Sequence, residues 1–152
     1  MIDLIKSCPL FHELFDREIE HIISRCMVAK YESGQMILRE NEHGQDFFLL
    51  LSGTCIVSRD INGKLITLAE LTRGEVFGET VLINETIRST NVEAKSDCDI
   101  LIISHEVIFD LYQKNTKVFA LLILNLARLL MKRLRASNEV ISNYHNDLDE
   151  VS

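Results

Sequence analysis

The sequence has no hydrophobic run long enough to cross a membrane and no excess of positive charge. Its longest apolar-rich run, residues 118–131, contains Asn125 and Arg128 and is shorter than the ~20 residues that a transmembrane helix needs. The first residues also lack the basic start and apolar core of a signal peptide. A net charge of −7 argues against independent binding of DNA or RNA, which usually requires a basic surface. We therefore expect a cytoplasmic protein that contacts no membrane and no nucleic acid directly.

Motifs of metal sites and of common catalytic sites are also missing. The four cysteines form no C-x-x-C pair, so zinc and thioredoxin-like sites are unsupported, and we expect reduced, mostly buried thiols. The five histidines form no H-x-H or i, i+4 pair, and only His43 lies near the expected strands, so a cupin-type metal enzyme is a weak alternative. Neither a G-x-S-x-G motif nor a Walker loop occurs. We expect no catalytic residues, no bound metal and no cofactor.

Short strands dominate the middle of the chain. Apolar segments of four to eight residues, some alternating and some continuous, are separated by Gly, Asn, Asp and Ser between residues 27 and 103. Asn62-Gly63 predicts a hairpin, because both residues tolerate positive φ. About eight short antiparallel strands at this spacing are typical of a closed sandwich or jelly roll. The segments that stand out are 27–31, 36–39, 47–51, 54–59, 65–71, 89–94 and 98–103.

Helices are predicted on both sides of these strands. Asp16 is the expected N-cap of one helix, Ser104 caps a second, and Asn115 ends the second and caps a third. The expected inward-facing residues are Ile19, Ile22, Ile23 and Cys26 in the first helix and Val107, Leu111 and Tyr112 in the second. The prediction is one mainly β domain over residues 1–152, with a helical piece at 1–26, strands at 27–103 and helices at 104–148.

The last helix is expected to be long, because residues 117–148 contain no glycine or proline. A helix of ~30 residues is ~45 Å long. One stripe of residues has spacings that alternate four and three, which is a heptad seam. The seam consists of Ile123, Ala127, Leu130, Leu134, Ser137, Ile141, Tyr144 and Leu148, and a second apolar face consists of Phe119, Leu122, Leu126 and Leu129. We expect a parallel homodimer through the seam, with a solvated tail after Asn138 as the alternative.

Residues 74–94, GEVFGETVLINETIRSTNVEA, carry the groups suited to a ligand. Gly78 permits a backbone conformation closed to other residues, and residues 79–83 can form one helical turn whose free N–H groups favour an anion. Arg88 suits bidentate binding of a phosphate, and an ionised Glu79 accepts hydrogen bonds from sugar hydroxyls. The stretch predicts a ribose-phosphate pocket. The alternative is an ordinary surface ion pair between Glu79 and Arg88.

This stretch resembles the phosphate-binding cassette of the cyclic-nucleotide-binding domain family. The family pattern is F-G-E, an apolar turn, a few variable residues, R-[ST/A]-A and a strand, and here it reads FGE at 77–79, TVLI at 80–83 and RST at 88–90. The resemblance extends from about Pro9 to Asn143. Three departures are Thr80-Val81 for an apolar-small pair, Ile87 for a frequent proline and Thr90 for a common alanine. They leave the acid and the arginine intact.

The resemblance implies a β-roll flanked by helices that binds cyclic AMP, with cyclic GMP or a larger cyclic dinucleotide as alternatives. Arg88 would hold the cyclic phosphate with Ser89 and the N–H groups after Gly78, and Glu79 would hold the ribose 2′-hydroxyl. Leucines of the barrel would cover the base and sugar, and the long helix would form a lid over the purine edge. The expected ligand-binding residues are Gly78, Glu79, Thr80, Arg88, Ser89, Leu68, Leu71, Ser137 and Asn138.

The resemblance also implies a regulatory sensor that acts on a protein effector. Ligand binding would move the lid helix about a hinge near Asn115 and alter the dimer seam. In the dimeric bacterial activators of the family a winged helix-turn-helix domain follows the lid helix. These 152 residues contain no such module, so we expect either a stand-alone sensor or one domain of a longer protein. The alternative function is a degenerate β-roll that dimerises or binds a partner without nucleotide.

Overall fold

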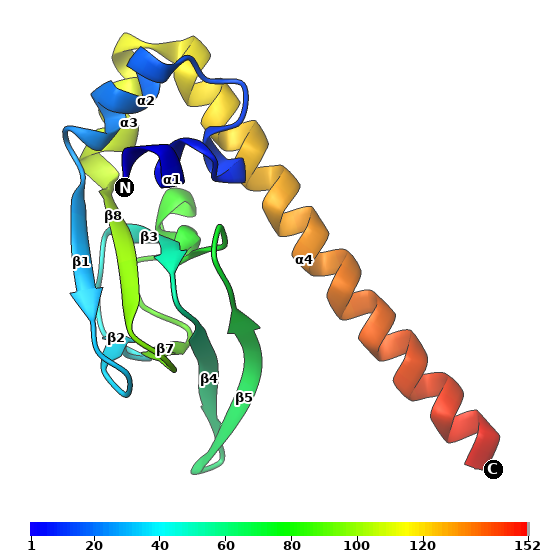
Figure 1. Ribbon diagram of the computed structural model, residues 1–152. Coiled ribbons are helices and arrows are strands. Elements are labelled where there is room, and N and C mark those ends of the chain that lie inside the picture. The colour runs from blue at the N-terminus through cyan, green and yellow to red at the C-terminus, as the bar shows by residue number, and fades with distance from the viewer. Residues whose placement is uncertain (152) are drawn as a thin grey trace.

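The computed structural model describes residues 1–151, and two four-stranded antiparallel sheets form its centre (Figure 1). One sheet has the strand order β1-β8-β3-β6 and the other β2-β7-β4-β5. The strands are β1 Met27–Tyr31, β2 Met36–Leu38, β3 Asp46–Ser52, β4 Cys55–Ile61, β5 Lys64–Leu71, β6 Val76–Phe77, β7 Asn91–Ala94 and β8 Cys98–Ser104. The helices are α1 Ile2–Lys6, η1 Pro9–Phe11, α2 Asp16–Ile23, η2 Glu79–Ile83, α3 His105–Lys114 and α4 Thr116–Val151, where η1 and η2 are 3₁₀ helices. The eight-stranded β-roll with flanking helices is confirmed.

β3 is apolar throughout because both of its faces are buried. Successive side chains of a strand point to opposite faces. Phe47, Leu49 and Leu51 therefore pack against the helices, whereas Phe48 and Leu50 face the interior between the two sheets. One continuous apolar strand thus contributes to two cores, a helical layer outside the roll and a second core inside it.

The turns that join the strands form where glycine and asparagine predict them. Asn62 and Gly63 have φ angles of 55° and 80°, and Ile61 pairs with Lys64 across the β4–β5 hairpin. The two-residue strand β6 was not predicted, because two residues cannot show a periodicity. Its pairing with β3 brings Phe77 beside Phe48, and the two rings stack with their centroids 5.0 Å apart.

The helix caps are partly as predicted. The Ser104 hydroxyl accepts a hydrogen bond from the Val107 N–H at 3.4 Å, and the Asn115 side chain caps α4. Asp16, however, is the first residue of α2 and not its N-cap, and the short helix α1 was not predicted. Tyr112 was expected to face inward but is 55% exposed, because the neighbouring Leu111 occupies the buried side of α3.

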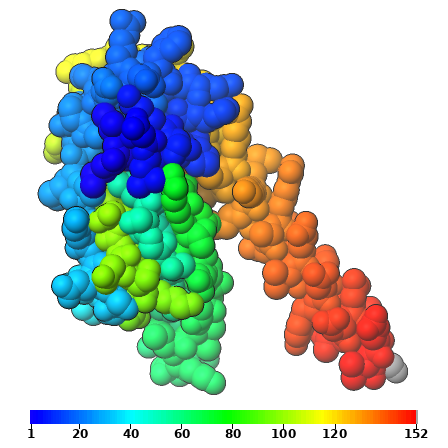
Figure 2. All heavy atoms as spheres, viewed as in Figure 1, coloured from blue at the N-terminus to red at the C-terminus, as the bar shows by residue number. Residues whose placement is uncertain are grey.

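Helix α4 has 36 residues and is therefore about 54 Å long. Its first half packs on the protein through the buried Val118, Leu122 and Leu126. Its second half extends away from the β-roll, as Figures 1 and 2 both show. All described residues from Leu134 onward are exposed, although the helix continues without a break to Val151.

A single buried amide fastens α4 to the N-terminal residues. Asn125 is only 2% exposed, and its Nδ2 donates hydrogen bonds to the backbone oxygens of Leu10 at 3.0 Å and His12 at 2.7 Å. Its Oδ1 accepts a hydrogen bond from Arg128 at 3.1 Å. The residue that interrupts the apolar run of α4 thus satisfies two carbonyl groups at the end of η1.

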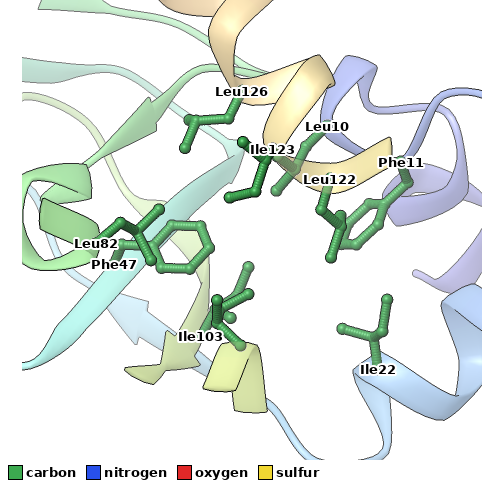
Figure 3. Close-up of a pocket in the computed structure, with 10 residues that line it drawn as sticks. Leu10, Phe11, Ile22, Phe47, Leu82, Ile103, Leu122, Ile123 and Leu126 are labelled. Atoms are coloured by element: carbon green, nitrogen blue, oxygen red, sulfur yellow. The ribbon is translucent and has the colours of Figure 1, made fainter. Parts of the chain in front are cut away.

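Beside this amide, apolar side chains from η1, α2, β3, β8 and α4 converge on a small gap (Figure 3). The gap measures about 10 Å³, which leaves room for at most one water molecule. Its lining consists of Leu10, Phe11, Ile22, Phe47, Leu82, Ile103, Ile108, Leu122, Ile123 and Leu126. Ile123, expected in the dimer seam, thus turns toward the chain's own core.

The four cysteines are free thiols, and three of them lie in the core. No disulfide joins the four cysteines, and Cys8, Cys55 and Cys98 are buried, as predicted for reduced thiols. Burial raises the pKa of Cys55 to about 12, and the adjacent Cys98 adds to the shift. Across residues 1–151, no three His, Cys, Asp or Glu side chains cluster as a metal site would require. None of the helices in this part of the chain has the length and apolar content of a membrane span.

The amide of Asn125 provides the first prediction. Asn125→Ala should lower the free energy of unfolding by about 1–3 kcal/mol, because the backbone oxygens of the buried Leu10 and of His12 lose their donor. Urea unfolding followed by circular dichroism measures this change. Asn143→Ala, at an exposed position of the same helix, is the control and should change the stability by less than about 0.5 kcal/mol. Equal effects of the two substitutions would contradict the fastening role of Asn125.

Candidate functional site

The cassette folds locally around two left-handed residues. β6 ends at Phe77, Gly78 has φ +74°, and η2 then runs to Ile83. Asn84, with φ +63°, ends η2 and lets the chain return toward Arg88 and β7. Because a side chain is strained at positive φ, glycine and asparagine are the residues expected at these two positions. The predicted turn at residues 79–83 is present, as a 3₁₀ helix.

Arg88 is buried beneath this turn. Its side chain is 5% exposed, and the guanidinium lies over the Phe48 ring, 5.6 Å from the ring centroid. Nη2 donates a hydrogen bond to the backbone oxygen of Asp46 at 2.7 Å, and Nη1 donates one to that of Gly78 at 3.2 Å. A Cβ atom on Gly78 would lie 3.0 Å from Arg88 Nη1, so the glycine also makes room for the arginine.

The positive charge of Arg88 has no ion-pair partner among the described residues. Both of its hydrogen bonds go to backbone carbonyl groups, which carry no net charge. Burial lowers the pKa of Arg88 below the ordinary value of arginine, and the charge of Asp46 opposes this shift. The group still stays protonated at neutral pH. A buried charge without a counter-ion is costly, so the guanidinium favours an anion beside it.

Glu79 and Arg133 form an ion pair beside Arg88. Arg133 Nη1 lies 3.3 Å from Glu79 Oε1, and Arg133 Nη2 donates a hydrogen bond to the backbone oxygen of Val76. Arg133 Nε is buried and has no hydrogen-bond partner in the part of the chain that the structure describes. The pairing of Glu79 with Arg88 that the sequence left as an alternative does not form. The carboxylate instead links the cassette to α4.

These residues surround a cavity of about 170 Å³. One part of its lining, the polar wall, carries Arg88, Glu79 and Arg133, and the rest, the apolar wall, consists of aliphatic and aromatic side chains. The polar wall consists of Gly78, Glu79, Thr80, Arg88, Ser89, Thr90 and Arg133, and the apolar wall of Leu38, Val57, Leu71, Phe77 and Val92. A cation, a carboxylate and hydroxyl groups on one side of a small apolar cavity can bind an anion that also carries hydroxyl groups.

A second, larger cavity of about 660 Å³ lies between the β5 region and α4. Leu71 and Arg133 line both cavities, so the two are neighbours. Leu68 and Ser137 line the larger cavity only, and the Ser137 hydroxyl donates a hydrogen bond to the backbone oxygen of Arg133 at 3.2 Å. Asn138 is exposed and lines neither cavity.

Six of the nine expected ligand-binding residues therefore meet at the smaller cavity. These are Gly78, Glu79, Thr80, Arg88, Ser89 and Leu71. The sequence reasoning missed Arg133, although this residue lies one helical turn before Ser137 and on the same face. It also missed Leu38, Val57 and Val92, whose inward positions on alternating strands were a usable signal.

A β-roll whose cavity is lined by a buried arginine without an ion-pair partner among residues 1–151 has the arrangement of a binding domain for a small anion. The family model "Cyclic nucleotide-binding domain" matches residues 28–115, which is more than half of the chain. The chain therefore belongs to the cyclic nucleotide-binding domain family.

Named relatives and solved structures agree with this assignment. The chain is 30% identical over 130 residues to a "cAMP-activated global transcriptional regulator CRP" from Pasteurella multocida, with 84% of this chain and 60% of the relative covered. It is 33% identical over 107 residues to human "cGMP-dependent protein kinase 2", with 68% of this chain and 14% of the relative covered. The chain thus spans about three fifths of the bacterial relative.

The solved structures include the Thermus thermophilus "Catabolite Activator Protein", with a TM-score of 0.73 and 32% identity, covering 90% of this chain and 63% of that one. A "cyclic nucleotide-binding domain" from Methylobacillus flagellatus has a TM-score of 0.83 at 24% identity, covering 94% of this chain and 81% of that one. The second likeness concerns the fold alone.

The Glu79–Arg133 ion pair provides the second prediction. A double-mutant cycle with Glu79→Gln and Arg133→Ala should give a coupling energy of about 0.5–1 kcal/mol, because the two side chains are 19% and 32% exposed and solvent weakens the pair. Urea unfolding of the four proteins measures it. The control cycle uses Glu70 and Lys95, a pair at 3.1 Å whose side chains are half exposed, and should give a smaller coupling. Zero coupling for Glu79 and Arg133 would contradict a stabilising link between the cassette and α4.

Proposed function

We propose that this domain binds a cyclic mononucleotide and acts as a regulatory sensor. The observation that carries the proposal is the buried guanidinium of Arg88, which has no ion-pair partner within residues 1–151 and lines a cavity of about 170 Å³. A cyclic phosphate carries one negative charge and would serve as the missing counter-ion. Charge-assisted hydrogen bonds between arginine and phosphate are among the strongest in proteins.

The residues that line the two cavities support a placement for the phosphate, the ribose and the base. The phosphate binds Arg88 and Ser89 on the polar wall. The ribose lies beside Glu79, whose carboxylate accepts a hydrogen bond from the 2′-hydroxyl. This hydrogen bond replaces part of the contact between Glu79 and Arg133. The base extends past Leu71 into the larger cavity, where Leu68 covers it and Ser137 reaches its edge.

Cyclic AMP is the first candidate ligand. Several relatives have cAMP in their names. The P. multocida regulator aligns with 84% of this chain, and the cAMP-dependent protein kinase regulatory subunit of Schizosaccharomyces pombe aligns with 61% of it. Cyclic GMP is the second candidate, because the chain is also similar to a kinase named for cGMP and because Ser89 carries a hydroxyl at the phosphate. A cyclic dinucleotide is disfavoured, since only one buried arginine lines the smaller cavity within residues 1–151.

We also propose that the exposed half of α4 pairs with a second copy of the chain in parallel. Leu134, Ile141, Tyr144 and Leu148 form an apolar stripe that no described residue covers, and each is more than half exposed. Stripes with alternating three- and four-residue spacing bury themselves by forming a coiled coil. Because Ile123 and Leu130 pack on the chain's own core, the seam begins near Leu134.

In a parallel dimer, Asn138 of one helix would lie near the ligand site of the other subunit. In a parallel coiled coil, residues that flank the seam on one helix meet residues five positions further along the partner helix. Arg133 and Asn138 flank the seam and are separated by five positions. Asn138 of the partner subunit would therefore lie beside Arg133, at the boundary of the two cavities. A ligand contact from this position would couple binding to the dimer seam.

The third prediction tests the ligand. At a concentration of about 100 times its dissociation constant, the correct nucleotide should stabilise the protein by about 2.7 kcal/mol. Thermal unfolding with cyclic AMP and with cyclic GMP measures the shift. Arg88→Ala should weaken binding at least ~100-fold, because two charge-assisted hydrogen bonds contribute about 1.5 kcal/mol or more each.

Arg17→Ala, at an exposed position of α2, is the matched control and should retain the shift. If neither nucleotide raises the melting temperature of the wild type, the sensor proposal fails. The β-roll would then be a dimerisation or partner-binding module without nucleotide. A shift that survives Arg88→Ala would place the ligand at another site.

The fourth prediction tests the dimer. Ile141→Glu should shift the chain from dimer to monomer at micromolar concentration, because the charge would be buried in an apolar seam. Sedimentation velocity measures the mass. Asn146→Glu adds the same charge on the opposite side of α4 and should leave the dimer intact. A wild-type chain that is monomeric throughout this range would contradict the proposal.

A further inference from the structure

Gly44 differs from the other glycines of the chain. The sequence contains six glycines, all within the described residues. Five of them have φ between +74° and +91°, a conformation that by itself explains glycine. Gly44 is not among them, so its backbone is open to any residue. The missing side chain at this position needs a different physical reason.

That reason is the guanidinium of Arg88. A Cβ atom on Gly44 would lie 2.4 Å from Arg88 Nη2, 2.6 Å from Nε and 2.8 Å from Cζ. These distances are far shorter than the ~3.5–4.0 Å at which such atoms pack. The space that a side chain of residue 44 would fill is therefore occupied by the group that lines the anion cavity.

Backbone hydrogen bonds prevent the segments around Gly44 and Arg88 from moving apart. The Gly44 N–H donates to the Thr86 backbone oxygen at 2.8 Å, and the Arg88 N–H donates to the Glu42 backbone oxygen, also at 2.8 Å. A third bond joins the Asn41 N–H to the Arg88 backbone oxygen at 2.8 Å. These three bonds hold the loop of residues 41–44 against residues 86–88.

The guanidinium is held by contacts that a shift would break. It donates hydrogen bonds to the backbone oxygens of Asp46 at 2.7 Å and Gly78 at 3.2 Å. The Phe48 ring covers a further side. A methyl group on residue 44 would therefore push the guanidinium out of this position, which breaks its hydrogen bonds or turns it away from the cavity.

We propose that Gly44 is a positioning residue of the anion site, because the absence of a side chain at this position leaves the space that Arg88 needs for the rotamer in which it faces the cavity. The proposal rests on the proposed function for its effect on a ligand. The contact between the two residues is independent of any ligand, and it can be tested in the free protein.

The first experiment is a double-mutant cycle on melting temperature with Gly44→Ala, Arg88→Ala and the double variant. Gly44→Ala should lower the melting temperature of the wild type by at least ~2–4 °C. In the Arg88→Ala background the same substitution should leave it unchanged or raise it, because alanine restricts the unfolded chain and the methyl group now has space. Equal shifts in both backgrounds would overturn the proposal. If Gly44→Ala does not fold, the double variant must fold, and its failure would also overturn the proposal.

The second experiment reads the position of the guanidinium directly. The ¹⁵Nε signal of Arg88, assigned by its loss in Arg88→Lys, should move in Gly44→Ala while the backbone spectrum outside residues 41–48 and 76–90 stays unchanged. An unmoved Nε signal would overturn the positioning role.

The third experiment measures the affinity for cyclic AMP by calorimetry. Gly44→Ala should bind at least ~10-fold more weakly than the wild type, and wild-type affinity in the variant would overturn the proposal. If the wild type binds neither cyclic AMP nor cyclic GMP, the proposed function fails. The melting cycle and the Nε signal then still decide whether Gly44 positions Arg88.

Discussion

The arrangement of the site depends on one buried positive charge that the chain itself does not neutralise. Arg88 is held by two backbone carbonyl groups and by the face of Phe48, so its guanidinium is fixed in position while its charge has no ion-pair partner among the described residues. A fixed donor loses little entropy when an anion binds, which makes such a group an effective binding site. Gly78 and Gly44 make room for it, and the loop of residues 41–46 holds its backbone and its side chain.

Helix α4 is attached to the rest of the chain at two polar points. Asn125 joins it to the end of η1, and Arg133 joins it to Glu79 in the cassette. Up to the second point the helix packs on apolar residues, and beyond Arg133 it is exposed. Because Glu79 is also the proposed ribose ligand, a bound nucleotide would act on the second attachment and leave the first intact. The expected hinge near Asn115 stays a prediction.

The strands, the hairpin turn and the glycine turn of the cassette were predictable because each depends on neighbouring residues. Asn62-Gly63 and Gly78 take positive φ for reasons of local geometry, and β3 is continuous and apolar because it is buried on both faces. β6 escaped prediction because a two-residue strand exists only through its pairing with β3. Tyr112 was placed inward by helical period alone, and the packing of α3 placed it outward.

The sequence by itself determined the fold class, the cassette and the identity of the arginine that lines the smaller cavity, since turn residues, strand periods and a short motif are all encoded locally. Only the tertiary structure decided which charged groups meet. Arg88 is bonded to the carbonyl of a residue 42 positions away, and Glu79 is paired with Arg133, 54 positions away, in place of the nearby Arg88. Such contacts depend on how the two sheets and α4 pack, because side chains distant in sequence become neighbours only when the core closes.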